Sequence, residues 1–189
     1  MLRLYTGPMF CGKTTSMIRD AVNNSLTENK TIIIKYCNDI RYSSELFIIT
    51  HSGIEFKSDT YTTIIKSNGT KLMLCEIPDD VTLIGIDEGQ FYDDLVEFCT
   101  FWSRKGKSIS VSALDGDYKM HKFGQVCDLI PICDTVKKLN GICMVCKSNP
   151  SSFTVKLTDN PDIIDIGSKD KYKSACRACF YKITSPCSC

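Results

Sequence analysis

The sequence reads Gly7-Pro8-Met9-Phe10-Cys11-Gly12-Lys13-Thr14 between an apolar stretch at residues 2–6 and a segment whose apolar side chains recur at helical spacing. This matches G-x-x-x-x-G-K-[ST], with a strand before and a helix after, as a phosphate-binding loop requires. The glycines let backbone N–H groups turn inward on phosphates, where a side chain would obstruct the approach. Average composition gives such a match by chance in about one per cent of chains of this length. The stretch therefore predicts a nucleoside triphosphate site.

Two residues at the end of this loop carry the chemistry expected of it. Lys13 would place a positive charge at the β- and γ-phosphates, and the Thr14 hydroxyl can ligate Mg²⁺. Cys11 allows two interpretations, which the sequence leaves open. Its thiol pKa could be lowered by Lys13 and the helix N-terminus, which would make it reactive, or Cys11 could be a small residue that fits the loop.

Strands and helices are predicted to alternate through the first part of the chain. The apolar patterns predict strands at residues 2–6, 31–34, 81–86 and 108–114, helices around 17–22 and 95–102, and a hairpin formed by 48–50 and 54–56. This alternation indicates an α/β fold with a mostly parallel sheet flanked by helices. Ligands of such sheets bind beyond the carboxyl ends of the strands.

The character of the sequence changes near residue 141, where cysteine pairs, prolines and polar turns replace the strand–helix rhythm. We expect residues 1–140 to form a nucleotide-binding domain and residues 141–189 to form a small domain held by a metal. The twelve cysteines then indicate metal binding in a reducing compartment rather than a disulfide framework.

Acidic residues follow the predicted strand at 81–86. Asp87 has the position of a carboxylate that holds Mg²⁺, often through water. Glu88 is expected to face the other way, toward a second substrate, where it could accept a proton from an attacking hydroxyl. The alternative is a solvated acidic turn that caps a helix beginning near Asp93.

Two CxxC pairs have the spacing of a tetrahedral zinc site with four thiolates, formed by Cys143, Cys146, Cys176 and Cys179. Four sulfur ligands leave no open position, so the predicted zinc is structural. Cys187 and Cys189 are poorer candidates because they form a CxC at the tail. The long segment between the pairs, residues 147–175, is predicted to be a loop that covers a ligand.

Charge and hydropathy exclude several function classes. Lys and Arg total 23 against 22 Asp and Glu, with no long basic run, so we expect no nucleic-acid partner. No apolar run approaches the length of a membrane span, and no secretory leader is visible, so we expect a cytoplasmic protein without a membrane partner.

Several motifs resemble those of the type II thymidine kinases, in the order in which that family has them, from residue 2 to about 182. They are the loop at 7–14, Lys35-Tyr36-x-x-Asp39-x-Arg41-Tyr42, Ile86-Asp87-Glu88-Gly89-Gln90-Phe91, Ala113-Leu114-Asp115-Gly116, Phe123-Gly124, the two cysteine pairs and Asp170-Lys171-Tyr172. The sequence departs from that pattern at Tyr118, where the family has Phe, and at Ile166-Gly167-Ser168, which replace a Gly-Gly pair.

The resemblance implies a RecA-like P-loop fold with a zinc-based lasso, and a kinase that phosphorylates the 5′-hydroxyl of thymidine, with deoxyuridine also possible. It further implies ATP and Mg²⁺, structural Zn²⁺, a homotetramer and feedback inhibition by dTTP. Glu88 and Lys13 would be the catalytic residues, and the loop at 7–14 together with Asp87 would bind ATP and Mg²⁺. The substrate would contact Leu114, Tyr118, Phe123, Ile163, Ile164, Asp165, Ile166, Gly167 and Tyr172.

Other readings remain open at this point. One is a P-loop kinase of a different nucleoside or nucleotide, and another is a zinc-containing ATPase or nucleic-acid module. Asp39 and Arg41 match the family motif, although a salt bridge would explain them equally well. His51 and His121 are expected to be surface or packing residues.

Overall fold

A computed structural model of the 189-residue chain describes residues 1–37, 47–49, 55–67, 69–158, 160, 162–163 and 170–185. The first part contains, in chain order, β1 (Leu2–Thr6), α1 (Lys13–Ser25), β2 (Lys30–Lys35), β3 (Phe47–Ile49), β4 (Glu55–Lys57), β5 (Thr62–Lys66), η1 (Leu72–Leu74), β6 (Val81–Ile86), η2 (Gly89–Phe91), α2 (Leu95–Arg104), β7 (Ser108–Ala113), α3 (Val126–Leu129), η3 (Ile130–Ile132) and β8 (Thr135–Lys138). The second part contains β9 (Gly141–Ile142), β10 (Pro150–Ser151), β11 (Phe153–Lys156), β12 (Tyr172–Ala175) and α4 (Arg177–Thr184).

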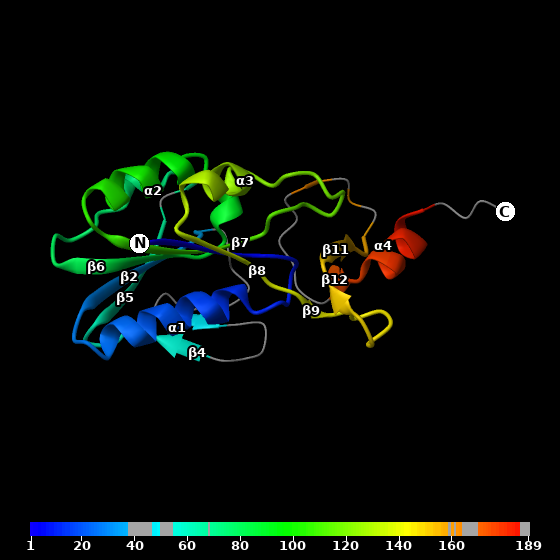
Figure 1. Ribbon diagram of the computed structural model, residues 1–189, viewed down its shortest axis with the longest axis horizontal. Helices are drawn as coiled ribbons and strands as arrows, with labels where there is room; N and C mark the ends of the chain where they lie inside the picture. The colour runs from blue at the N-terminus through cyan, green and yellow to red at the C-terminus, as the bar shows by residue number, and fades with distance from the viewer. Residues whose placement is uncertain are drawn as a thin grey trace.

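The central element is a six-stranded sheet in the order β5-β2-β6-β7-β1-β8. Each neighbouring pair of strands runs parallel, which confirms the predicted parallel α/β fold. Figure 1 shows α1 on one face of this sheet and α2 with α3 on the other. The predicted hairpin is also present, since β3 pairs antiparallel with β4.

The face beneath α1 is packed by alternate residues of the strands. Tyr5, Ile33 and Leu83 lie on this face and belong to one buried cluster with Met17 of the helix. The side-chain period of two sends their neighbours to the opposite face. Because both faces are covered, the strands read as continuous apolar runs, as in β2, which is buried from Thr31 onward.

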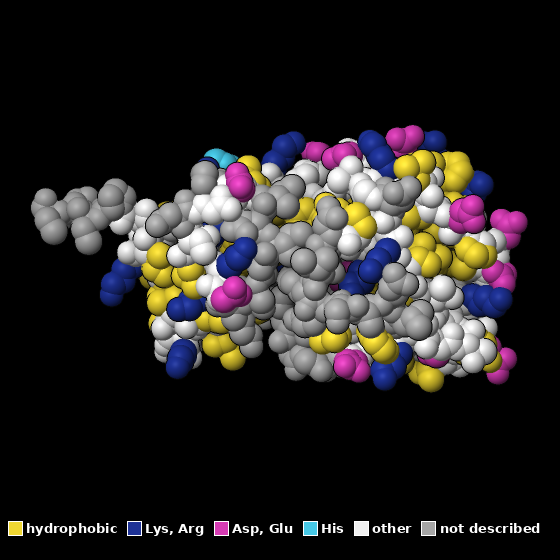
Figure 2. Space-filling view, turned by 180° about the vertical axis from the view of Figure 1, so that it is seen from behind, with side chains coloured by type: hydrophobic (Ala, Val, Ile, Leu, Met, Phe, Trp, Pro, Cys, Tyr) yellow, Lys and Arg dark blue, Asp and Glu magenta, His cyan; other side chains and the backbone are white. Residues whose placement is uncertain are grey.

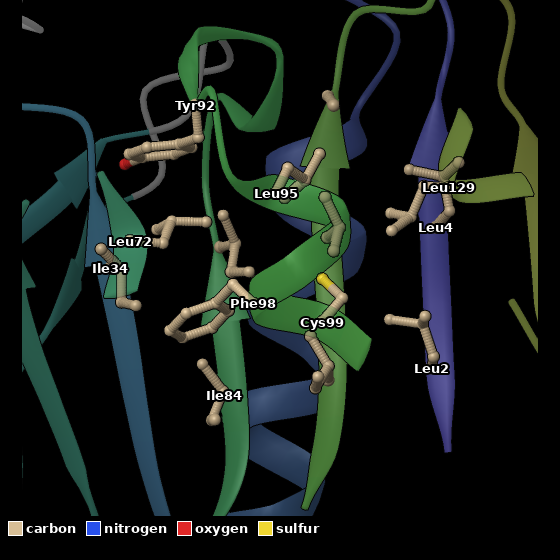
Figure 3. Close-up of a cluster of buried hydrophobic side chains, with 14 of the residues drawn as sticks. Leu2, Leu4, Ile34, Leu72, Ile84, Tyr92, Leu95, Phe98, Cys99 and Leu129 are labelled. Carbon is tan, nitrogen blue, oxygen red and sulfur yellow. The ribbon is translucent and has the colours of Figure 1, made fainter. Parts of the chain in front are cut away.

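The opposite face forms the larger core, shown in Figure 3. Ile34 and Ile84 point from the sheet toward Phe98 of α2, Leu4 lies beside Leu129, and all of these side chains are fully buried. Burying side chains of this size contributes about 1.5–3 kcal/mol each. This double-sided packing fixes the strands whose carboxyl ends carry the candidate site.

The sequence did not predict two of the sheet's strands. β5 and β8 lie at its two edges, and β8 reads Thr-Val-Lys-Lys with mostly exposed side chains. Lysines are common on edge strands because they discourage pairing with another chain. Figure 2 shows basic and acidic side chains interspersed on the face that it draws.

The second part lies at one end of the molecule in Figure 1, with β11 paired antiparallel to β12 and α4 packed against β11. Its small core consists of Cys143, Val155, Ala175, Cys176 and Phe180. It meets the phosphate loop where the backbone N–H of Met9 donates to Oγ1 of Thr154 over 3.0 Å. Whether residues 1–140 and 141–189 are separate domains stays a prediction. Within the described ranges, no helix has the length and apolar character needed to cross a membrane.

Candidate active site

The loop between β1 and α1 has the geometry that its glycines predict. Gly7 has φ +131°, and a Cβ built there would lie 2.2 Å from the carbonyl oxygen of Leu139. Gly12 has φ +87° and caps α1. Phe10 also has a positive φ, of 65°, which is uncommon for a bulky residue. A loop with left-handed residues at these places turns its N–H groups toward a common centre, which suits an anion.

Lys13 is 8% exposed, and its Nζ donates to the carbonyl oxygen of Pro8 over 2.7 Å. This bond folds the side chain back over the loop. From this position the ammonium group can exchange its hydrogen bond with the carbonyl oxygen of Pro8 for bonds with phosphate oxygens.

Thr14 and Asp87 bring hard oxygen ligands together from α1 and from the end of β6. Oγ1 of Thr14 donates to Oδ1 of Asp87 over 3.0 Å and lies 3.4 Å from Oγ of Ser112. Asp87 is 4% exposed, and its backbone N–H donates to the carbonyl oxygen of Ile34. A hydroxyl beside a carboxylate fits Mg²⁺, which prefers oxygen ligands. Burial of Asp87 also argues against the solvated acidic turn.

Glu88 is half-buried and has left-handed backbone angles, φ 54° and ψ 45°. Its Oε2 accepts a 2.6 Å hydrogen bond from Nε2 of Gln90. In turn, Oε1 of Gln90 accepts the backbone N–H of Leu114 over 2.9 Å. Non-glycine residues in this backbone region are enriched at functional sites, where the surrounding structure holds them.

Aromatic rings collect beside these acids. Phe91 stacks on Tyr36 with ring centroids 4.6 Å apart and meets Phe123 edge-on at 5.6 Å. Leu114 and Phe123 are both half-buried. The predicted base pocket included Leu114 and Phe123 but omitted Tyr36 and Phe91. Phe91 could have been found from its place directly after Gln90 in the motif.

Tyr118, the third predicted pocket residue, contacts cations. Nζ of Lys119 lies 5.3 Å from its ring centroid, and Nζ of Lys156, at the end of β11, lies 5.2 Å from it. Such cation–π contacts contribute about 0.5–1 kcal/mol at exposed sites. Lys156 therefore links Tyr118 to the foot of the predicted covering loop.

The structure describes that segment at residues 147–158, 160, 162–163 and 170–175, and it contains β10, β11 and β12, so the loop is shorter than the predicted range 147–175. Tyr172 is buried and pairs with Lys156 across β11 and β12, while Ile163 is 47% exposed. The predicted contacts Ile164, Asp165, Ile166 and Gly167 lie outside the described residues, as do Asp39, Arg41, His51, Cys187 and Cys189. His121 lies on the surface, with its side chain 75% exposed, as expected.

The four predicted zinc ligands converge. The sulfur atoms of Cys143, Cys146, Cys176 and Cys179 all lie within 4.8 Å of one another. Tetrahedral zinc with Zn–S bonds of about 2.3 Å places its sulfurs about 3.8 Å apart. The separation of 4.0 Å between the sulfur atoms of Cys146 and Cys176 is close to that value, so this set fits the metal.

Local hydrogen bonds favour the thiolate form of one of these ligands. Burial acts to raise the pKa of Cys143. The backbone N–H groups of Cys146, Cys176 and Val145 outweigh it and lower the pKa to about 6. Zinc binds thiolates, so Cys143 is suited to bind without a large cost of deprotonation.

The structure contradicts one of the two interpretations of Cys11 that the sequence left open. Its Sγ lies 3.9 Å from Nζ of Lys13, which favours the thiolate, yet burial has the larger effect and raises the pKa of Cys11. The expectation of a lowered pKa was wrong because the sequence did not reveal this burial. The interpretation as a small residue that fits the loop agrees with the structure.

Comparisons with known proteins point to one family. A family model described as thymidine kinase matches residues 1–180. The thymidine kinase of Fowlpox virus is 38% identical over 182 residues, which cover 95% of this chain and 96% of the relative. Those of Yaba monkey tumor virus and Vaccinia virus are each 38% identical, over 184 and 182 residues, with 97% and 95% of this chain and 96% of each relative covered.

Proposed function

This chain belongs to the thymidine kinase family, and from that premise we propose that it transfers the γ-phosphoryl group of ATP to the 5′-hydroxyl of thymidine, with Mg²⁺ at Thr14 and Asp87 and with Glu88 as the base. The observation that carries the proposal is the hydrogen bond from Thr14 to Asp87. Thr14 is the last residue of the phosphate loop, and Asp87 directly precedes Glu88 in the chain. The site for the phosphates and the site for the acceptor alcohol would therefore lie together at the carboxyl end of β6.

The phosphate loop would bind the triphosphate of ATP. Backbone N–H groups of the loop and Nζ of Lys13 would contact the β- and γ-phosphates. Thr14 and Asp87 would hold Mg²⁺, which when bound neutralises charge on those phosphates. Positioning and charge stabilisation of this kind supply most of the catalysis in phosphoryl transfer.

Glu88 would act on the second substrate. As the 5′-oxygen of thymidine bonds to the γ-phosphorus, the bond from that phosphorus to the leaving oxygen of ADP breaks in line with it. The hydroxyl proton passes to the carboxylate of Glu88. Half-burial of Glu88 suits this role, because the side chain is accessible to a substrate yet held by its neighbours.

The base of thymidine would lie among Leu114, Tyr118 and Phe123, to which we add Phe91 because its ring contacts Phe123. The loop residues 163–167 would cover the base, and Tyr172 would lie near the sugar. Aromatic and aliphatic walls suit a flat base with a methyl group. Zn²⁺ at the four cysteines would hold the foot of this loop. A homotetramer, feedback inhibition by dTTP and a cytoplasmic location, where thiolates stay reduced, complete the proposal.

A substrate panel tests the proposal. The zinc-loaded protein is assayed with ATP, Mg²⁺ and, in turn, thymidine, deoxyuridine, deoxycytidine and deoxyguanosine. We expect thymidine to be the best substrate and deoxyuridine the next. Preference for deoxycytidine or deoxyguanosine would assign a different nucleoside, and ATP hydrolysis that is indifferent to every nucleoside would indicate an ATPase.

A further inference from the structure

Gln90 makes two hydrogen bonds that join the candidate base to a different strand. Gln90 is 3% exposed, and its side chain bridges Glu88, at 2.6 Å, to the backbone N–H of Leu114, at 2.9 Å. Glu88 follows β6, whereas Leu114 follows β7, the neighbouring strand of the sheet. The amide of Gln90 therefore spans the two strand ends between which the substrate would lie.

The direction of both bonds is fixed by chemistry. A backbone N–H only donates, so the amide oxygen of Gln90 must face Leu114. The amide nitrogen then faces Glu88 and donates to its carboxylate. The bond from Gln90 thus restricts the rotation of the carboxylate of Glu88.

The backbone of Gln90 is held as firmly as its side chain. Gly124 lies against it so closely that a Cβ there would come within 2.3 Å of the carbonyl oxygen of Gln90. Phe91, the next residue, is fixed by its contacts with Tyr36 and Phe123. A side chain anchored in this way can hold the flexible carboxylate of Glu88 in one orientation.

We propose that Gln90 is a positioning residue that holds the carboxylate of Glu88 in one orientation and ties it to the wall of the base pocket at Leu114. The inference rests on the proposed role of Glu88 as base. Because the amide of Gln90 contacts both Glu88 and Leu114, a nucleobase that displaces Leu114 also disturbs Glu88. A poorly fitting nucleoside therefore loses turnover as well as affinity.

Two substitutions separate the two bonds of Gln90. Gln90→Met removes both bonds at similar length. Gln90→Glu retains an oxygen that can accept from Leu114, but it places a second carboxylate against Glu88. We expect each to lower kcat for thymidine by about 10- to 100-fold while KM for ATP stays unchanged, because the carboxylate loses its orientation.

The split between kcat and KM provides a readout that a merely structural role would not move. A mispositioned base lowers kcat for thymidine while KM for ATP stays at the wild-type value, whereas a general loss of structure changes both parameters and the midpoint of thermal unfolding.

Gln125 offers a matched control. Its Oε1 accepts the backbone N–H of Val96 over 2.9 Å, and its Nε2 donates to the carbonyl oxygen of Asp93 over 2.6 Å. It bridges two segments as Gln90 does, but both its partners are backbone groups. Gln125→Met should lower the midpoint of thermal unfolding while kcat for thymidine stays within about twofold of the wild-type value. A wild-type kcat in both folded Gln90 variants would overturn the inference.

Double substitution distinguishes this inference from the proposed function. In a Glu88→Gln background, adding Gln90→Met should change kcat by no more than about twofold, because the bond that it removes no longer serves a base. An inactive Glu88→Gln variant together with fully active Gln90 variants would reject the inference alone. A fully active Glu88→Gln variant would reject Glu88 as the base, and the inference with it.

Discussion

Thr14 and Asp87, which lie 73 positions apart in the chain, are joined by a 3.0 Å hydrogen bond at the carboxyl edge of the sheet. The bond forms because the β1–α1 loop and the end of β6 reach the same edge, with β7 between their strands. Binding of Mg²⁺ would use the same two oxygen atoms. This contact is where the phosphate site can be tested most directly.

Asp87→Asn should weaken the response of the kinase to Mg²⁺. The amide keeps the shape of the side chain and can still accept from Thr14, but it lacks the charge that attracts the cation. We expect the Mg²⁺ concentration for half-maximal rate to rise by about 10- to 100-fold. Titration of the initial rate with Mg²⁺ measures this change. Asp80→Asn is the control, because Asp80 is an exposed partner of Lys30; equal responses of the two variants would contradict the assignment.

Glu88→Gln should retain binding of both substrates while losing most turnover. The amide preserves size and polarity but cannot accept the hydroxyl proton, and general bases contribute about 10²- to 10⁴-fold to rate. Calorimetric binding of thymidine and of ATP, alongside kcat, separates the two effects. Wild-type kcat in the variant would remove Glu88 from the mechanism.

Cys11 should react slowly with iodoacetamide near neutral pH. Burial raises the pKa of Cys11, so less thiolate is present than for a free thiol, and the rate should keep rising with pH beyond the ordinary range of thiol pKa values instead of levelling off there. Peptide mapping by mass spectrometry follows Cys11 separately from the other cysteines. Alkylation faster than that of a free cysteine at neutral pH would show that Lys13, and not burial, sets the reactivity.

Removal of zinc should unfold the second part of the molecule. Cys143→Ser removes a proposed zinc ligand that is buried in the small core with Val155 and Phe180. Each kcal/mol lost lowers the unfolding midpoint by about 2–4 °C in a chain of this size. Metal analysis and thermal scans, with Cys127→Ser as control, measure the effect. Zinc content and unfolding midpoint like those of the control would exclude Cys143 as a ligand.

The parts of the site that lie close together in sequence were predictable. The phosphate loop, Asp87 and the cysteine pairs depend on short spacings, which the residues themselves reveal. The bridge from Gln90 to Leu114 depends on β6 and β7 being neighbours, and the contact of Tyr36 with Phe91 depends on β2 lying beside β6. Strand order is a property of the whole sheet, so local patterns could not supply these contacts.

Besides strand order, the local sequence could not supply the burial of individual side chains. Lys13 next to Cys11 suggests a lowered thiol pKa, and only the packed loop shows that desolvation has the larger effect. The edge strand β8 was missed for a related reason. Its exposed lysines do not resemble the apolar runs of the buried strands, and its pairing with β1 alone identifies it as part of the sheet.

Gly124→Ala, compared with Gly106→Ala, tests how much the close contact between Gly124 and the backbone of Gln90 matters for stability. Both glycines have positive φ, +55° and +80°, so an alanine at either position costs about 1–2 kcal/mol of backbone strain. At Gly106 a Cβ meets nothing within 4 Å, whereas at Gly124 it would lie 2.3 Å from the carbonyl oxygen of Gln90. This overlap should add about 1–3 kcal/mol to the loss of unfolding free energy.

The same overlap should reach the active site, because the backbone of Gln90 must move to relieve it. We therefore expect Gly124→Ala to lower kcat under conditions where the variant is still folded, and Gly106→Ala to leave kcat unchanged. Urea unfolding at a fixed zinc concentration gives the stability of each variant, and kcat is compared where both are fully folded. Equal losses of stability in the two variants would mean that the backbone of Gln90 yields freely to Gly124. The firm anchoring attributed to that contact would then be absent.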